Sequence, residues 1–174
     1  TMDGSCVEAG YWLRTSKAEL SSMPWYHEVM ELNGYKYFTA PAVNPELPDT
    51  KGGKSSSRFI SLIRLFLDSG GEPEGIVEVI QDCDVIFSLA AQLEHTNPES
   101  KVFIYNTRKE LVYPYTASES QDFYSEIERH NLKESQSRLI RTEEGTSMLL
   151  TYDFVPDYDW TVIVTKPEEA VYKQ

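Results

Sequence analysis

Cysteine and histidine are scarce in this sequence, and their scarcity excludes several kinds of chemistry. The 174 residues contain two cysteines and three histidines, and no C-x-x-C pair occurs. A zinc site or a thioredoxin-like redox centre is therefore not expected. Cys6 and Cys83 either form one disulfide in an exported chain or act as small hydrophobic residues, because sequence alone cannot place two sulfur atoms within bonding range.

Long apolar runs and an excess of positive charge are also missing. No stretch approaches the ~18 consecutive apolar residues of a transmembrane helix. Acidic residues number 28 against 16 basic ones, which gives a formal net charge of −12 at pH 7. Such a chain is repelled by nucleic-acid phosphates and by anionic lipids, so we expect neither as a partner. Because the chain opens on Thr1 rather than Met, we expect it to be a piece of a longer protein.

The sequence patterns of common enzymes are absent as well. There is no G-x-S-x-G nucleophile elbow, no phosphate-binding glycine loop and no cysteine with a nearby histidine. His27 and Glu31 are spaced i, i+4 on a predicted helix and could form one edge of a metal site, but two ligands do not make a site. We therefore expect this chain to be no enzyme and to hold no metal and no cofactor.

What the sequence does contain is a regular succession of helix and strand patterns. Apolar residues make up 40% of the chain, which is enough for a hydrophobic core. In the first half, Ser22 can cap a helix that Pro24 opens and Gly34 ends. Around this helix the pattern predicts a hairpin at residues 1–13, a strand at 35–40, a long loop at 41–57, and strands at 57–68 and 76–82.

The second half repeats this order of elements. A connecting helix is predicted at residues 84–94, with Val85, Leu89 and Leu93 along one side. It is followed by a predicted hairpin at 101–115, a helix at 121–131, three strands within 137–167 and a helical stub after Pro167. The order predicts an α+β protein of two units, residues 1–82 and 83–174, each an antiparallel sheet flanked by helices.

Three stretches of this double unit resemble the tandem Cache domain, a PAS-like sensor module of bacterial receptors. They are Trp25-Tyr26 with residues 37–41, the strand–turn–strand 60–81, and the closing segment 157–171, in which Trp160 precedes a strand. The resemblance implies that residues 1–82 form a membrane-distal unit that binds the ligand. It also implies that residues 83–174 form a membrane-proximal unit that relays the signal.

The same resemblance implies a setting for the parent protein. The long N-terminal helix of the family and the first distal strand are missing from this fragment, and the stub after Pro167 would continue into a membrane span. The parent would be a membrane-anchored homodimer, a sensor histidine kinase, with this module on the extracellular side. A chemotaxis receptor or a cyclase with the same module is the alternative. The expected partner is a small-molecule ligand or a soluble binding protein.

The candidate ligand-binding residues come from the predicted distal unit. Trp25 and Tyr26 either border the pocket, as the resemblance implies, or pack the helix onto the sheet. Ser61 either donates a hydrogen bond inside the pocket or bonds the backbone. Arg64 pairs with an anionic group of the ligand or of the protein, and strand alternation puts it on the opposite face from Ser61. Tyr37 and Thr39 share one face of a strand and complete the candidates.

One departure from the family pattern bears on the ligand. Family members that bind amino acids carry an Arg two residues before the Trp–aromatic pair and an Asp at the end of the last distal strand. Here Met23 takes the first place and Ile80 or Gln81 takes the second, although Asp82 is close by. An ordinary amino acid is therefore not the expected ligand.

Overall fold

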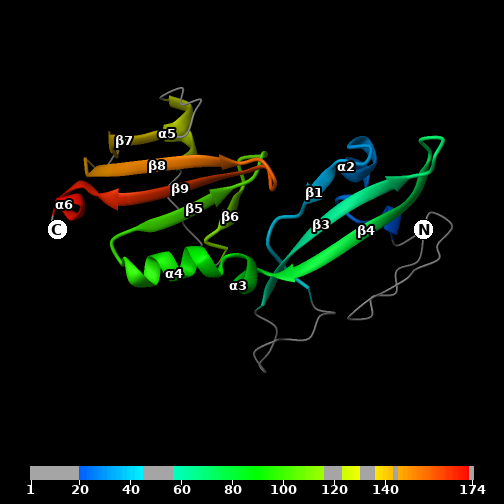
Figure 1. Ribbon diagram of the computed structural model, residues 1–174, viewed down its shortest axis with the longest axis horizontal. Helices are drawn as coiled ribbons and strands as arrows, with labels where there is room; N and C mark the ends of the chain where they lie inside the picture. Colours follow the sequence, from blue (N-terminus) through cyan, green and yellow to red (C-terminus); the bar gives the residue numbers. More distant parts are fainter. Residues whose placement is uncertain (1–19, 45–56, 116–122, 130–135, 143–144, 173–174) are drawn as a thin grey trace. The chain divides into compact units, whose positions relative to one another are not determined.

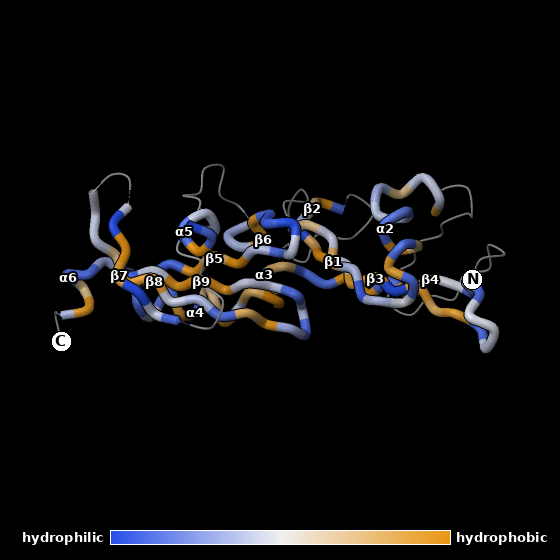
Figure 2. The backbone as a smooth tube through the Cα atoms, turned by 90° about the horizontal axis from the view of Figure 1, so that it is seen from above, coloured by the Kyte–Doolittle hydropathy of each residue, from blue (hydrophilic) through white to orange (hydrophobic). Residues whose placement is uncertain are grey.

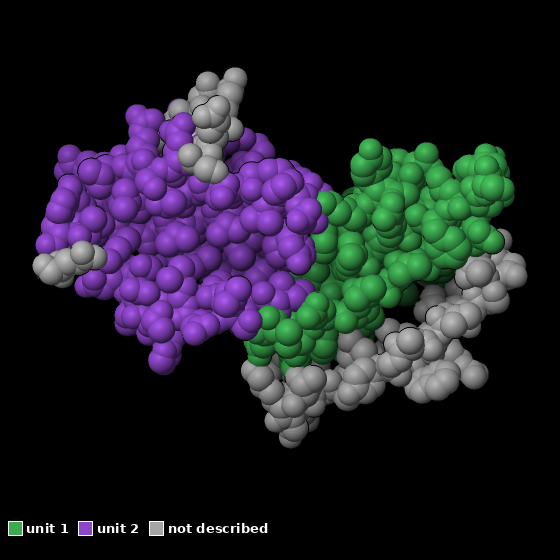
Figure 3. Space-filling model, in the orientation of Figure 1, with its two compact units in different colours: residues 1–85 green, residues 86–174 purple. Residues whose placement is uncertain are grey.

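The computed structural model describes residues 20–44, 57–115, 123–129, 136–142 and 145–172, which fall into two compact units. Unit 1 ends at Val85 and unit 2 begins at Ile86 (Figures 1 and 3). Each unit contains one antiparallel sheet. The predicted α+β class with two antiparallel sheets is therefore confirmed, whereas the hairpin predicted at residues 1–13 lies outside the described residues.

In unit 1, strand β3 is the centre of the sheet. Its elements are α2 (Tyr26–Glu31), β1 (Lys36–Phe38), β2 (Ala42–Val43), β3 (Arg58–Leu67) and β4 (Pro73–Asp82). Strand β4 pairs antiparallel with β3 along one edge, and β1 and β2 pair antiparallel with it along the other. The two long strands were predicted almost to their ends, because both are apolar runs bounded by glycine and proline turn signals.

Alternation along these strands gives the unit 1 sheet two different faces. We call the face that α2 covers the helix face, because Val29 of α2 packs against Ile63 and Leu65 of β3, and all three are buried. The opposite side, which we call the outer face, carries the alternate residues. There Phe66, Val77 and Val79 are exposed. The ring of Phe66 lies over Gly75, where any added Cβ would come within 2.3 Å of the ring.

Helix α2 begins later than the sequence predicted. Its N-cap is Trp25, which makes no side-chain cap hydrogen bond, so Ser22 does not cap this helix. Hydrogen-bonded turns precede it instead: the amide of Met23 donates to the carbonyl of Leu20 (3.2 Å), and the amide of Tyr26 donates to that of Met23 (3.0 Å). These turns satisfy amides that a capped first turn would have used. The helix ends at Glu31 with Leu32 as its C-cap, and the chain leaves it through Asn33 and the predicted Gly34, which adopt φ +46° and +93°.

The predicted single helix at residues 84–94 is wrong, because it is interrupted. The segment forms two helices, α3 (Cys83–Ile86) and α4 (Ser88–Thr96), separated at Phe87. The three apolar residues predicted along one side of the helix, Val85, Leu89 and Leu93, are exposed. The physical reason is that Phe87 is buried against the rings of three aromatic residues, and this packing sets which side of the segment faces the protein. The ring contacts are with Tyr113, Tyr115 and Trp160, at centroid distances of 5.3, 5.9 and 5.6 Å.

Unit 2 contains a sheet with the strand order β6-β5-β9-β8-β7. Its strands are β5 (Lys101–Tyr105), β6 (Leu111–Tyr113), β7 (Gln136–Arg141), β8 (Ser147–Val155) and β9 (Trp160–Pro167), and its other helices are α5 (Phe123–Arg129) and α6 (Glu168–Val171). Its main core includes residues of α5 and of the sheet (Phe123, Ile127, Ile140, Leu150 and Ile163). The hydropathy colouring places most apolar segments on the strands (Figure 2). The predicted hairpin, helix and closing strands are confirmed, and Pro167 is the N-cap of α6.

Three neighbouring strands are arranged alike in the two sheets. In unit 2 the neighbours β9, β8 and β7 pair antiparallel in that order, and in unit 1 β4, β3 and β1 do the same. In each unit a helix precedes these three strands in the chain. The repeat therefore lies in topology, although the two segments have no obvious sequence repeat.

Candidate functional site

The helix face of unit 1 brings Trp25 and Tyr37 to one hydrophobic cluster. Both side chains are half-buried and pack against the buried core of Val29, Ile63 and Leu65. Trp25 is the N-cap residue of α2, and Tyr37 lies on β1, where it pairs with Ile63. This placement agrees with both interpretations, because an aromatic residue that packs the helix onto the sheet and one that borders a pocket would lie in the same position.

Tyr26 lies on the same helix but outside that cluster. It is half-buried, and its ring and the His27 ring form a T-shaped pair whose centroids are 5.8 Å apart. Because Tyr26 is the next residue after Trp25, the helix turns it about 100° away. The structure therefore places Trp25 and Tyr26 beside each other along the chain without giving them one shared contact surface.

Thr39 and Ser61 are joined by two hydrogen bonds that continue the pairing of β1 with β3. The Ser61 amide donates to the Thr39 hydroxyl oxygen at 2.9 Å, and the Thr39 amide donates to the Ser61 carbonyl at 3.0 Å. The Ser61 residue is 8% exposed and lies on the helix face, two residues before Ile63.

Arg64 stands apart from the other candidates. It pairs with Lys36 and Val77 on the outer face, and its Nε donates to the carbonyl of Gly34 at 2.6 Å. The predicted placement of Arg64 and Ser61 on opposite faces is thus confirmed. The guanidinium connects β3 to the end of α2, where Gly34 leaves the helix, and this contact supports the structural interpretation of Arg64.

Sequence inspection missed Glu78, an acidic residue on the helix face. Glu78 pairs with Ile63 across β3 and β4, so both side chains point to the side that α2 covers. It lies between Ile76 and Ile80, which share its face, and its side chain is exposed. The signal was available in the sequence, because the alternation of residues 76–82 places this Glu in line with the two isoleucines.

Asp82 also lies on the helix face but already has a local partner. It pairs with Phe59 at the end of the sheet, and its Oδ1 accepts a hydrogen bond from the Asp84 amide at 2.8 Å. This bond holds the first turn of α3, as short acidic side chains often do at helix starts. One carboxylate oxygen of Asp82 is thus engaged by the backbone.

Cys83 is buried and carries a free thiol. Burial, followed by the negative charges of Asp82 and Asp84, raises the pKa of this thiol to about 12. A thiol with such a pKa stays protonated at neutral pH and is a poor nucleophile. Cys6, the other cysteine of the disulfide that the sequence left open, lies outside the described residues.

Metal ligands do not converge in the part of the chain that the structure describes. No group of three or more His, Cys, Asp or Glu side chains that could hold a metal ion occurs among these residues. His27 and Glu31, the predicted edge of a metal site, are both exposed on α2. Within the same described ranges, no helix has the length and apolar character needed to cross a membrane.

In unit 2, Glu94 attaches α4 to the sheet. Its Oε1 accepts a hydrogen bond from the Val102 amide at 2.9 Å, and its Oε2 accepts one from the Tyr113 hydroxyl at 2.8 Å. Burial and the bond to Glu94 together raise the pKa of Tyr113 well above its ordinary value. We call this arrangement the Glu94 clamp. It holds the helix that follows unit 1 in the chain to β5 and β6.

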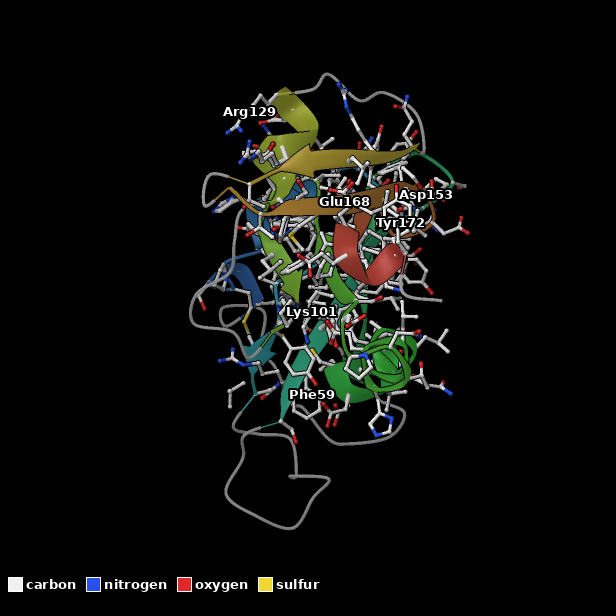
Figure 4. All side chains as sticks on the ribbon, turned by 90° about the vertical axis from the view of Figure 1, so that its left-hand side faces the viewer. Phe59, Lys101, Arg129, Asp153, Glu168 and Tyr172 are labelled. Carbon is white, nitrogen blue, oxygen red and sulfur yellow. The ribbon has the colours of Figure 1, made fainter. Side chains whose placement is uncertain are left out.

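Helix α5, which contributes to the unit 2 core, contains a buried acid. Glu126 of α5 is 8% exposed, and its Oε1 accepts a hydrogen bond from Nη1 of Arg129 at 2.8 Å. Arg129 lies at the end of the helix, where Figure 4 labels it. The pair is one helical turn apart, so the charge of Glu126 is compensated within its own element.

Of three comparisons with known proteins, the one with solved structures gives matches. No protein-family model matches the sequence, and no curated protein does. Solved structures match: the ligand-binding domain of the Pseudomonas aeruginosa PAO1 amino acid chemoreceptor PctB, in complex with L-Gln, aligns with a TM-score of 0.59 at 13% identity. The alignment covers 88% of this chain and 60% of that domain.

Two further structures have the same fold. The extracellular domain of mmHK1S-Z2, described as a histidine kinase, gives a TM-score of 0.60 at 14% identity over 89% of this chain and 59% of its own. The domain of the P. aeruginosa amino acid chemoreceptor PctC, in complex with GABA, gives a TM-score of 0.55 at 11% identity. This alignment covers 93% of this chain and 65% of that domain. The chain therefore spans about three fifths of the length of these domains. The predicted resemblance to the tandem Cache domains of chemoreceptors and sensor histidine kinases is confirmed at the level of fold.

Proposed function

We propose that this chain is the ligand-binding part of an extracellular sensor domain of a bacterial transmembrane receptor. The observation that carries the proposal is the tandem fold, which the chain shares with domains solved with L-Gln and with GABA. Unit 1 is the membrane-distal unit and binds a small molecule on its helix face. Unit 2 is the membrane-proximal unit and relays the signal toward α6.

The proposed site consists of Trp25, Tyr26, Tyr37, Thr39 and Ser61. Aromatic side chains bury the apolar part of a small ligand, and hydroxyl groups fix its orientation. Arg64 is not part of this proposed site, because it lies on the outer face and bonds the backbone of Gly34.

The parent protein is a sensor histidine kinase in this proposal, and a chemoreceptor or a cyclase is the alternative. Both a histidine kinase and chemoreceptors occur among the structures with this fold, so the fold supports the receptor class without separating its members. The receptor acts as a membrane-anchored homodimer. Ligand binding shifts its equilibrium only by the difference in affinity between its two states.

A thermal-shift screen of the chain tests the proposal. The compounds are sugars, organic acids, amines, amino acids and nucleosides. A ligand present at ~100 times its dissociation constant stabilises the folded state by about 2.7 kcal/mol. For a chain of this size, that stabilisation raises the melting temperature by about 5–10 °C.

Two matched variants assign a hit to the proposed site. Tyr37→Phe removes only one hydroxyl from the helix face and is expected to reduce the shift. Tyr35→Phe makes the same chemical change at a position that is 76% exposed, and it is expected to leave the shift unchanged. An equal response of both variants contradicts the assignment to this face, and the absence of a shift with every compound favours a protein partner.

A further inference from the structure

Helix α4 has the reverse orientation of an ordinary surface helix, which turns its apolar residues to the protein and its charged residues to solvent. Its Glu94 points to the unit 2 sheet, where it bonds the Val102 amide and the Tyr113 hydroxyl. Leu89 and Leu93 are 78% and 38% exposed, and Leu89 lies about 140° around the helix from Glu94. Figure 1 shows α4 beside β5 at one side of the sheet. The side of α4 away from the Glu94 clamp is therefore apolar and accessible to a partner.

This exposed side, formed by Leu89, Gln92 and Leu93, is also uncharged, and we call it the leucine face. Helix α4 contains Glu94 as its single Asp, Glu, Lys or Arg, and the Glu94 clamp uses that side chain. The whole chain, in contrast, has a formal net charge of −12, so two copies repel each other in most orientations. At the leucine face a second copy meets apolar surface without opposing one acid of α4 to another.

The outer face of unit 1 is another exposed apolar surface, but it does not suit a contact between two copies. Val77 and Val79 are 51% and 53% exposed there, and Lys36 and Arg64 lie on the same face. A two-fold contact brings the same patch of both copies together, so these basic residues would oppose each other. The leucine face has no charge to oppose.

Resting on the homodimer that the proposed function includes, we propose that the leucine face is an interface between two copies of this chain. In a two-fold contact of antiparallel helices, Leu89 packs against the partner's Leu93, and Leu93 packs against the partner's Leu89. Gln92 lies beside both leucines on the helix, so it comes close to the same residue of the other copy.

The length of α4 limits the strength of this contact. Its nine residues span about 13.5 Å, and such a contact buries less than the ~1,200 Å² of a standard interface. We therefore expect the 174-residue chain to dimerise with a dissociation constant on the order of 0.1–1 mM. Anchoring two chains close together raises their effective concentration to about the millimolar range, which populates the contact in the parent receptor.

Sedimentation equilibrium of the 174-residue chain, at concentrations that span the expected dissociation constant, measures the self-association. Leu89→Asp puts a charge at the centre of the leucine face, and we expect it to weaken association by about 10-fold to 100-fold. Val79→Asp adds the same charge at a position that is 53% exposed on unit 1, and it is expected to leave association unchanged. Added salt screens the repulsion between the two acidic chains, so the wild type should associate more tightly as the salt concentration rises.

Cross-linking locates the contact on α4. Gln92→Cys and Ala91→Cys place a thiol at two exposed positions that are about 100° apart around the helix. Both variants also carry Cys6→Ser, and the remaining Cys83 is buried. Helices in contact are about 8–10 Å apart, within reach of a short bis-maleimide. We expect this reagent to join Gln92→Cys chains into dimers and to leave Ala91→Cys chains largely monomeric.

The outcomes separate this inference from the proposed function. The α4 interface is overturned if the wild type stays monomeric throughout the concentration range, if Leu89→Asp and Val79→Asp weaken association equally, or if the two cysteine variants cross-link equally. In each of these cases a thermal shift with a ligand still supports the small-molecule sensor. Dimers through α4 without a thermal shift from any compound support the interface and count against small-molecule sensing.

Discussion

At the scale of single residues, some of the candidate side chains have their partners within the protein itself. Arg64 is the clearest local case, because its Nε bonds the Gly34 carbonyl at 2.6 Å on an exposed surface. We expect Arg64→Ala to lower the free energy of unfolding by about 0.5–1.5 kcal/mol, the usual net value of one hydrogen bond. Urea denaturation measures this change.

Ligand binding serves as the control for Arg64. The guanidinium lies on the face away from α2, so Arg64→Ala is expected to leave the affinity for any ligand of unit 1 unchanged. A loss of binding without a matching loss of stability would show that this guanidinium contacts the ligand after all.

Cys83 gives a second prediction at this scale, through pH. The ordinary thiol pKa is 9.0, and burial raises that of Cys83 to about 12. Between these values the unfolded chain releases its proton first, so the stabilising contribution of the buried neutral thiol is complete below pH 9 and is lost as pH rises toward 12. The stability difference between the wild type and Cys83→Ala should fall by about 1.4 kcal/mol per pH unit above pH 9.

Urea denaturation of both proteins from pH 8 to pH 10 measures that slope. Other groups that titrate there, such as tyrosines and lysines, are common to both proteins and cancel in the difference. A difference that stays constant across this range would mean that the Cys83 thiol ionises as readily in the folded state as in the unfolded chain.

At the scale of elements, α4 depends on the Glu94 clamp more than on its own packing. No residue of α4 is buried, and Leu89 is 78% exposed, so little apolar area holds this helix to the sheet. We expect Glu94→Ala to destabilise unit 2 by about 1.5–3 kcal/mol, because two bonds to a charged group are lost. Gln92→Ala, at an exposed position of the same helix, should cost less than about 0.5 kcal/mol.

A double-mutant cycle of Glu94→Ala with Tyr113→Phe isolates the clamp. The two groups bond directly at 2.8 Å, so we expect a coupling energy of about 0.5–3 kcal/mol. Hydrogen exchange of the α4 amides should accelerate in Glu94→Ala while that of β8 is unchanged. Additive effects of the two substitutions would show that Glu94 and Tyr113 contribute separately.

The elements also show which parts of the fold the sequence could predict. Strands β3, β4 and β9 follow from apolar runs between turn residues, which are local patterns. The start of α2 was missed because hydrogen-bonded turns at residues 20–26 precede it. The break at Phe87 was missed because this residue packs against aromatic rings from two distant segments. Strand alternation groups Glu78 with Ile76 and Ile80, but that these residues lie on the face that α2 covers is known only from the structure.

At the scale of the whole molecule, unit 2 has a sheet and a hydrophobic core of its own. Unit 2 has its own five-stranded sheet, and every residue of its main core comes from residues 86–174. Its aromatic cluster around Phe87 also lies within this range. A self-contained core is the condition under which a domain folds alone.

We therefore expect a fragment of residues 86–174 to fold cooperatively and to bind none of the compounds that stabilise the whole chain. Circular dichroism melting and an amide NMR spectrum would establish the fold, and the same calorimetric titrations would measure binding. The proposed helix face, with Tyr37, Ser61 and Glu78, is absent from this fragment, so binding should disappear rather than weaken. A folded fragment that retains the affinity of the whole chain would place the ligand in unit 2, and an unfolded fragment would mean that the two units depend on each other for stability.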